Sequence, residues 1–160
     1  MTLPSDIILM RYDSPCGPLI LGCRGDTLCL CDWAKAWPTM PEATWGRCPV
    51  IDEAAHQLDE YFAHKRQSFS VPLLPLGTPF QQRVWQSLLQ VPYGTTISYA
   101  RQAELLGMPR ALRAIAAANG RNRLSIFIPC HRVIGANGAL TGYRGGLAAK
   151  RFLIELEKHL

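Results

Sequence analysis

The spacing of the apolar residues changes once along the chain, close to Gly77, and this change restricts the possible folds more than any other feature. Before it, short apolar runs of strand length alternate with turns rich in Asp, Gly and Pro. These runs span residues 7–10, 19–23 and 28–31. After it, apolar residues recur at helical spacing. We therefore expect an α+β chain with two domains, residues 1–76 and 77–160.

The first domain is expected to hold a small antiparallel sheet, because its three apolar runs follow one another with only short turns between them. Residues 34–49 lack any period and indicate a loop. A helical spacing returns at residues 52–62. Pro72 and Pro75 limit residues 69–76 to an edge strand or an extended linker.

The second domain is expected to be mostly helical. Thr78 and Ser98 can each cap a helix, and Pro109 suits the first turn of another. The two short helices on either side of the turn at Gly107 resemble a helix-turn-helix. The expected helices span residues 79–89, 99–106, 109–118 and 147–156.

The two domains differ in charge. Residues 1–77 hold six Lys or Arg and nine Asp or Glu, which gives a net charge of −3. Residues 78–160 hold eleven Lys or Arg and three Glu, which gives a net charge of +8. A basic domain suits a polyanion such as nucleic acid, although many small basic domains bind none.

One face of the helix expected after Pro109 combines small and basic residues. Its members are Arg110, Ala114, Ala117 and Arg121, with Arg113 at the border. The alanines would let the backbone approach a groove wall while the arginines meet phosphates or bases. A small-residue contact between two helices is the alternative. Leu112 and Ile115 are expected to pack inward.

Five of the six cysteines lie in the first 48 residues. No apolar run has the length of a membrane span, and the first ten residues lack a secretory signal pattern. We therefore expect a cytoplasmic protein with reduced thiols and no membrane partner. The candidate zinc ligands are Cys16, Cys23, Cys29, Cys31 and His56. No C-x-x-C spacing is present, so packing within the sheet is favoured over a metal site.

The sixth cysteine, Cys130, has distinctive neighbours. The apolar run 124–128 is expected to form a strand that Pro129 ends. His131 and Arg132 follow the cysteine, and both can carry positive charge. Such surroundings lower the pKa of a thiol and yield a reactive thiolate. The alternative is a buried structural cysteine beside a surface histidine.

A nucleophilic cysteine needs a base, and His131 is the nearest candidate. Adjacent side chains of an extended chain point apart, so we expect a bent backbone or a bridging water between the two. A histidine base needs a third group to orient it. Of the three carboxylates after residue 77, Glu104 lies in the helix-turn-helix and Glu155 on a solvated face. Glu157 is the most inward and is our choice, with a frayed surface glutamate as the alternative.

Several motifs, in one order, resemble the O6-alkylguanine-DNA alkyltransferases. Pro129-Cys130-His131-Arg132-Val133 is similar to the active-site signature of that family. The other matching motifs are Gly77-Thr78-Pro79-Phe80-Gln81, Val84-Trp85, Pro92-Tyr93-Gly94, Ser98-Tyr99, Arg113-Ala114, Ala118-Asn119, Asn122, Gly138, Thr141-Gly142-Tyr143, Gly145-Gly146-Leu147 and Lys150. The resemblance covers residues 77–157 well and residues 1–76 weakly.

The resemblance implies a ribonuclease-H-like first domain and a single-use methylated-DNA–[protein]-cysteine S-methyltransferase without a cofactor. The damaged base would be rotated out of the duplex, and Cys130 would take the alkyl group from O6-alkylguanine or O4-alkylthymine. A thioether is a poor leaving group, so each molecule would act once. The implied partner is double-stranded DNA with alkylated bases, bound by a monomer. The alternative is a DNA-binding or lesion-binding module, or a regulator, in which Cys130 is inert.

The resemblance also assigns roles to single residues. Cys130, His131 and Glu157 would form the catalytic triad, Asn122 would bridge the turns of the site, and Tyr99 would donate a hydrogen bond to the departing base. Arg113 would enter the duplex from the minor groove. Helix residues that would meet DNA are Arg110, Ala114 and Ala117. Backbone groups at Val133 and at Tyr143-Arg144 would hold the base edge, with the Tyr143 ring beside the alkyl group.

Overall fold

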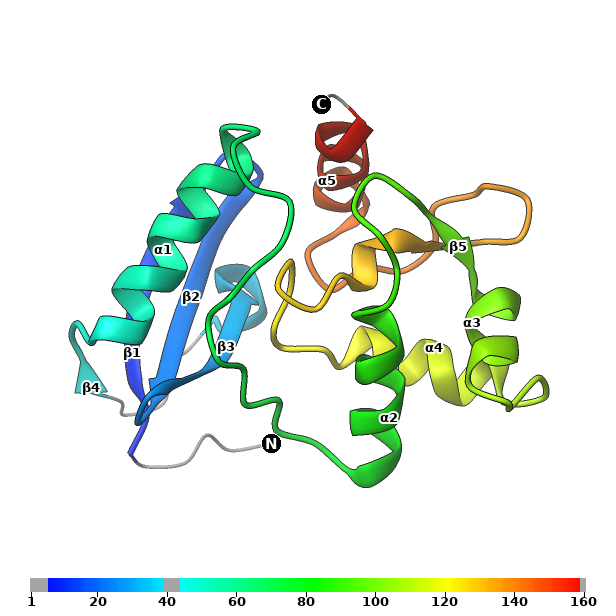
Figure 1. Ribbon diagram of the computed structural model, residues 1–160, viewed down its shortest axis with the longest axis horizontal. Coiled ribbons are helices and arrows are strands. Elements are labelled where there is room, and N and C mark those ends of the chain that lie inside the picture. The colour runs from blue at the N-terminus through cyan, green and yellow to red at the C-terminus, as the bar shows by residue number, and fades with distance from the viewer. Residues whose placement is uncertain (1–5, 39–43, 159–160) are drawn as a thin grey trace.

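The computed structural model describes residues 6–38 and 44–158. Within these residues, a four-stranded sheet with one helix on its face lies beside a group of four helices (Figure 1). The α+β architecture and the mostly helical second half that the sequence predicted are confirmed. In the part of the chain so described, no helix combines the length and the apolar character needed to cross a bilayer.

The sheet is built from three antiparallel strands and one short parallel strand. The strands are β1 (Ile8–Ser14), β2 (Gly17–Arg24), β3 (Thr27–Trp33) and β4 (Thr44–Trp45). Their spatial order is β3-β2-β1-β4, and β4 runs parallel to β1. Arg24 pairs with Thr27 across a two-residue turn in which Gly25 has a φ of 59°. Tight hairpins require this left-handed backbone, so the predicted meander is confirmed with its turn chemistry.

A single helix, α1 (Pro49–Phe62), lies across one face of the sheet (Figure 1). It begins three residues before the range that the sequence predicted, because Pro49 occupies the first turn. The loop expected over residues 34–49 is interrupted by a short 3-10 turn, Ala34–Ala36, and by β4. The helix buries its apolar stripe against β2 and β3.

The outer edge of β3 is covered by two later segments of the same chain. The N–H of Leu28 donates to the carbonyl of Pro72 at 2.8 Å, and the N–H of Cys31 donates to that of Arg123 at 2.8 Å. Residues 69–76 are thus an extended segment beside the sheet, as the prolines predicted. Covering this edge also joins the sheet to the helical half, because Arg123 leads directly into the Cys130 region.

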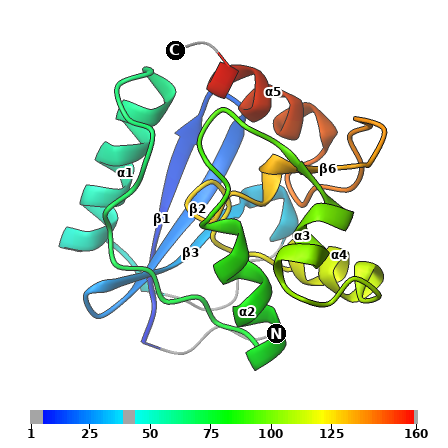
Figure 2. The same ribbon diagram turned by 45° about the vertical axis from the view of Figure 1, so that its right-hand side comes forward.

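The helical half contains α2 (Pro79–Leu88), α3 (Tyr99–Leu105), α4 (Leu112–Gly120) and α5 (Leu147–Lys158) (Figure 2). A short parallel pair, β5 (Ile97–Ser98) and β6 (Val133–Ile134), connects them. The Thr78 hydroxyl accepts from the Gln81 N–H at 3.2 Å, and the Gln81 side chain accepts from the Thr78 N–H at 3.0 Å. Ser98 caps α3 by accepting from the Arg101 N–H at 3.0 Å.

The second helix of the helix-turn-helix starts three residues later than the sequence predicted and includes Asn119 and Gly120, which were expected to stop it. It begins at Leu112, because the Ala111 N–H donates to the Met108 carbonyl in a separate turn that contains Arg110. The prediction that Leu112 packs inward is wrong, since 41% of it is exposed, whereas Ile115 is fully buried as expected.

One large apolar cluster continues from the sheet into the helices. It includes Leu21 of β2, Leu58 of α1, Val84 of α2, Ile115 of α4 and Leu153 of α5. Because the two halves share this cluster, they pack together as one core, and the polar side chains between them rest on that core.

Two of the cysteines in the first half of the chain lie against each other. The sulfurs of Cys23 and Cys48 are in contact, but their Cα atoms are 7.4 Å apart, beyond the span of about 4.4 to 6.8 Å that a disulfide normally bridges, so the expectation of reduced thiols stays a prediction. The free thiols are Cys16, Cys29, Cys31 and Cys130. Within residues 6–38 and 44–158, no three His, Cys, Asp or Glu side chains lie together as a metal site would require.

Candidate active site

The apolar run before Cys130 forms a tight turn, and the prediction of a strand there is wrong. The Ile128 N–H donates to the Leu124 carbonyl at 2.8 Å, and Ile126 adopts a φ of 74°. A β-branched residue in this left-handed region is strained, and such strain persists only where the surroundings enforce it. Leu124, Ile126 and Ile128 are all buried. The run is therefore apolar because the whole turn is surrounded by protein, and not because it forms a strand.

Cys130 opens a 3-10 turn, Cys130–Arg132, and is 5% exposed. The bent backbone that the adjacent Cys and His required is therefore present. Asn122 secures the turn, because its amide donates to the Ile128 carbonyl at 2.8 Å and to the Cys130 sulfur at 3.2 Å. Its own oxygen accepts from the Leu124 N–H at 3.0 Å. One side chain thus fixes both ends of the strained turn and the thiol.

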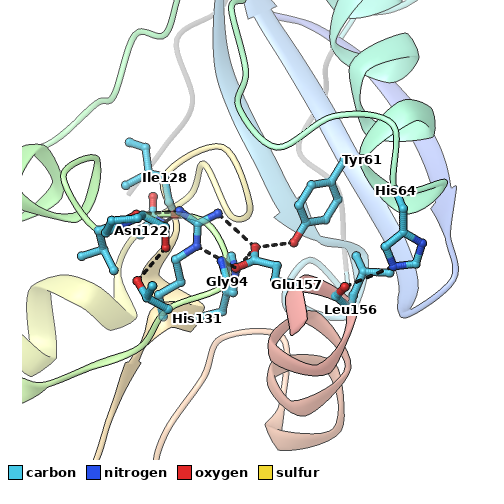
Figure 3. Close-up of polar contacts among 12 residues, drawn as sticks. Tyr61, His64, Gly94, Asn122, Ile128, His131, Leu156 and Glu157 are labelled. Carbon is cyan, nitrogen blue, oxygen red and sulfur yellow. Dashed lines mark hydrogen bonds and ion pairs between the residues drawn. The ribbon is translucent and has the colours of Figure 1, made fainter. Parts of the chain in front are cut away.

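The Glu157 carboxylate is contacted by donors from four residues (Figure 3). Its Oε2 lies 2.7 Å from His131 Nε2 and accepts from the Tyr61 hydroxyl at 2.6 Å. Arg132 adds two hydrogen bonds, Nε to Oε1 at 2.8 Å and Nη2 to Oε2 at 3.0 Å. The backbone N–H of Gly94 approaches Oε1 at 3.4 Å. Glu157 is 2% exposed, which rules out the alternative of a frayed surface residue.

These contacts determine the charge states of the two buried groups. Burial raises the pKa of Glu157, but hydrogen bonds and charges from His131 and Arg132 outweigh it and hold the pKa at about 2. Burial lowers the pKa of His131 despite the neighbouring carboxylate. A carboxylate can only accept, so a neutral His131 must donate its Nε2 proton to Glu157. Its Nδ1 then carries the lone pair, and this buried atom has no protein partner among the described residues.

Cys130 is protonated at rest. Burial raises the pKa of its thiol to about 11, although the Asn122 hydrogen bond and the Lys150 charge act in the opposite direction. The sequence expectation of a lowered thiol pKa is therefore wrong for the resting site, because desolvation exceeds the effect of the neighbouring cations. The thiol must lose its proton to a base during reaction, and the free Nδ1 of His131 suits that role.

A pocket of about 650 Å³ opens above the cysteine. Of the predicted site residues, the pocket wall contains Tyr99, Arg113, Cys130, Tyr143 and Arg144. Leu112, Ala116, Asn119, Gly120, Thr141 and Gly142 complete the wall without having been predicted. The Val133 side chain is fully buried below it, so only its backbone could face a ligand.

The remaining predicted DNA-binding residues lie outside the pocket. Ala114 and Ala117 are exposed on α4, and Arg110 is exposed in the turn before it. The alternative of a close helix contact through these alanines does not apply, because a packed face would be buried. An exposed surface of alanines with arginines at both ends can lie against a nucleic-acid backbone.

The loop over the pocket is tied to the first half of the chain. Arg144 donates to both oxygens of the fully buried Asp32 at 2.7 and 2.8 Å, and the Tyr143 ring meets Trp33 edge-on at 5.8 Å. Lys150 donates to the Thr141 carbonyl at 2.9 Å. Bidentate pairs of this kind fix direction as well as distance, so the loop is held in a defined position.

Three functional neighbours were missed by sequence reasoning. Arg132 was noted only as a charge, and Tyr61 carried no signal because it is one aromatic residue among several on an amphipathic helix. Asp32 did carry a signal, since it is a charged residue inside the apolar strand β3. A buried charge requires a partner, but the identity of Arg144 depends on the tertiary fold.

The fold and the site together define a protein with a helix-turn-helix beside a buried cysteine, histidine and glutamate. Residues 79–159 match the family described as 6-O-methylguanine DNA methyltransferase, DNA binding domain, and residues 8–75 match its ribonuclease-like domain. The chain belongs to this 6-O-methylguanine DNA methyltransferase family.

Relatives and solved structures agree with that assignment. A methylated-DNA–protein-cysteine methyltransferase of Mycobacterium leprae is 49% identical over 92% of this chain and 90% of its own length. The constitutive enzyme of that name from Bacillus subtilis is 45% identical over 91% of this chain and 92% of its own length. The crystal structure of Mycobacterium tuberculosis OGT in complex with DNA superposes with a TM-score of 0.85 at 45% identity, covering 94% of this chain and 92% of that one.

Replacing Arg113 by Ala tests its expected insertion into DNA. We expect transfer from a lesion in duplex DNA to slow by about 10- to 100-fold, because the rotated base would lose its substitute in the stack. Transfer from the free base O6-methylguanine should change little. Arg110→Ala, which removes the same charge outside the pocket, serves as the control and should weaken DNA affinity alone. An equal loss on both substrates in Arg113→Ala would contradict the insertion role.

Proposed function

We propose that this chain repairs alkylated DNA by direct reversal, transferring the alkyl group from O6-alkylguanine to its own Cys130. The observation that carries the proposal is the thiol itself, which lies in a pocket wall beside a buried His131–Glu157 pair. Its membership of a methyltransferase family and the basic helix-turn-helix support the same conclusion. The inert-cysteine alternative offers no reason for a buried histidine, paired with a carboxylate, directly after the cysteine.

The reaction follows from the charge states. His131 takes the thiol proton through Nδ1, directly or through one water, and Glu157 stabilises the resulting imidazolium. The thiolate attacks the alkyl carbon, a carbon–sulfur bond forms, and the carbon–oxygen bond breaks with its electron pair going to guanine. The leaving guanine takes up a proton from solvent, and the imidazolium of His131 releases the thiol proton to solvent. The Tyr99 hydroxyl stabilises the departing base by a hydrogen bond. Because the thioether that forms is not cleaved afterwards, each protein molecule accepts only one alkyl group.

The pocket accounts for the lesion and its route of entry. A base inside the stack is out of reach, so the target nucleotide rotates out of the duplex into the pocket. Tyr143 and the neighbouring glycine-rich backbone then face the alkyl group, with Tyr99 at the pocket wall. Arg113, an exposed residue of the pocket wall, fills the vacated place in the stack. Ala114 and Ala117 allow α4 to approach the minor groove closely.

The decisive test is the intact mass of the protein after mixing with a duplex that carries one O6-methylguanine. We expect a gain of one methyl group that maps to Cys130 and saturates at one equivalent of DNA. An unmethylated duplex of the same sequence is the control and should leave the mass unchanged. No gain in mass with the duplex still bound would favour a lesion-binding module. Continued turnover beyond one equivalent would contradict the single-use reaction.

We also propose that the protein acts as a monomer in the cytoplasm, on DNA with alkylated O6-guanine or O4-thymine. A reducing compartment would keep the Cys130 thiol free for attack. The division at residue 76 stays a prediction, and the ties from β3 to Arg123 and from Asp32 to Arg144 support a close association of the two domains. No step of the proposed reaction requires a cofactor.

A further inference from the structure

A tyrosine of the first half of the chain contacts the carboxylate that orients the catalytic histidine. Tyr61 lies on α1 and is fully buried, and its hydroxyl donates to Oε2 of Glu157 at 2.6 Å (Figure 3). The same oxygen atom is bound by His131 Nε2 at 2.7 Å. Arg132 Nη2 also donates to this oxygen, at 3.0 Å. Three donors therefore share Oε2, and Tyr61 is the one that comes from outside the helical half.

The Tyr61 hydroxyl remains a donor over the whole working range of pH. Burial raises its pKa far above the usual value, and the Glu157 charge raises it further. Its ring is held by edge-on contacts with Phe62 at 5.2 Å and with Tyr93 at 6.2 Å. A fixed donor to a charged acceptor withdraws charge from that acceptor and lowers its affinity for another proton.

We propose that Tyr61 is a positioning residue of the active site, which sets the proton affinity of His131 by sharing the Oε2 atom of Glu157. This inference rests on the proposed alkyl transfer and deepens it. The first half of the chain then affects the reaction directly. Helix α1 must pack close enough to α5 for Tyr61 to contact Glu157, because this contact adjusts the pKa of His131.

The charged and titratable groups around this pair limit what else could set its titration. Glu157 of α5 faces His131 and Arg132 of the 3-10 turn, Tyr61 of α1 and Tyr93 of the segment between α2 and β5. Lys150 of α5 and Arg132 face His131 and act against its protonation. Lys150 is also held by the Thr141 carbonyl at 2.9 Å and Arg132 by the Val91 carbonyl at 2.7 Å. We therefore expect both cations to keep their positions when the Tyr61 hydroxyl is removed, so that this variant changes one donor only.

The direction of the effect follows from the shared oxygen. Without the hydroxyl, Glu157 holds more charge at Oε2 and attracts the proton on His131 more strongly. The pKa of His131 therefore rises. Since protonated His131 cannot accept the thiol proton, the acid limb of the pH–rate profile should move to higher pH. We expect a shift of about 0.5 to 1 pH unit in Tyr61→Phe.

The experiment measures single-turnover transfer from free O6-methylguanine to Cys130 across pH, using the full chain, with intact mass as the readout. Tyr12→Phe is the matched control, because Tyr12 of β1 also donates to a carboxylate, Asp59, at 2.6 Å but lies outside the site. Its acid limb should coincide with that of the unaltered protein. In a Glu157→Gln background, Tyr61→Phe should cause no further shift.

A second substitution keeps the measurement decisive if Tyr61→Phe folds poorly. Fluorotyrosine at position 61 retains the hydroxyl and makes it a stronger donor, so the acid limb should move to lower pH. A slower rate with an unchanged acid limb in both variants would show a purely structural role and overturn the inference. Absence of transfer in the unaltered protein would instead overturn the proposed function.

Discussion

Replacing Cys130 by Ala should abolish the gain of an alkyl group completely while leaving DNA binding intact. The cysteine is the only group in the proposed reaction that forms a bond to the alkyl carbon, so no slower route remains. Its side chain makes one hydrogen bond, from Asn122, and removing it should change DNA affinity by less than about 1 kcal/mol. Intact mass and a binding titration with the same methylated duplex check both parts.

Cys16 provides the matched control for this variant. It is also a free thiol, partly buried in the sheet half, and burial raises its pKa. Cys16→Ala should take up one alkyl group at the normal rate. Uptake that persists in Cys130→Ala would contradict the assignment of Cys130, and loss of uptake in Cys16→Ala would show that any thiol removal impairs the protein.

Replacing Glu157 by Gln should slow the reaction by about 100-fold or more, because the imidazolium of His131 loses the charge that stabilises it. The proton of Cys130 is then harder to remove, so the apparent thiol pKa rises. The acid limb of the profile should move to lower pH, since His131 becomes harder to protonate. Single-turnover rates across pH test this result, and an unchanged profile would remove Glu157 from the triad.

The same substitution should reduce stability. Arg132 is buried and donates twice to Glu157, and it would keep its charge without a counter-ion. Breaking such a buried pair costs about 3 to 5 kcal/mol. The carboxylate pKa is lowered from 4.5 to about 2 on folding, so its stabilisation is present above pH 4.5 and is lost as pH falls through 2. Glu157→Gln should lack this acid-dependent part, which urea unfolding at several pH values would show.

Glu155 offers a control for Glu157 on the same helix. It is exposed and lies 3.4 Å from Lys158, so its ion pair is weak. Glu155→Gln should leave the rate, the pH profile and the unfolding free energy nearly unchanged. If Glu155→Gln lost as much rate or stability as Glu157→Gln, the effect would come from the net charge of α5 and not from the contacts of Glu157.

Local chemistry explains why so much of the fold could be predicted from sequence. The hairpin at Gly25, the capping box at Thr78 and the cap at Ser98 each depend on residues within three positions, and each is present. The inward position of Glu157 followed from helical spacing alone. The family motifs included part of the pocket wall around Cys130, such as Tyr99, Arg113 and Tyr143, but not Leu112, Ala116 or Gly120.

The failures share one cause, which is that tertiary contacts determined the outcome. Leu112 looked like a core residue, but the turn before α4 rotates it into the pocket wall. The run 124–128 looked like a strand because all its apolar residues are buried, yet it folds back on itself to place Cys130. Tyr61 and Asp32 meet partners 96 and 112 residues away, and no local pattern specifies such pairs.

The burial of Cys130 has a consequence for how long each molecule remains useful. A repair protein that is consumed in use is wasted by every reaction with a stray electrophile or oxidant. With its pKa at about 11 and only 5% of the residue exposed, the thiol of the resting protein is almost entirely in its protonated, unreactive form. Desolvation raises the barrier to forming the thiolate, and it thereby also protects the cysteine from side reactions before the protein meets its lesion.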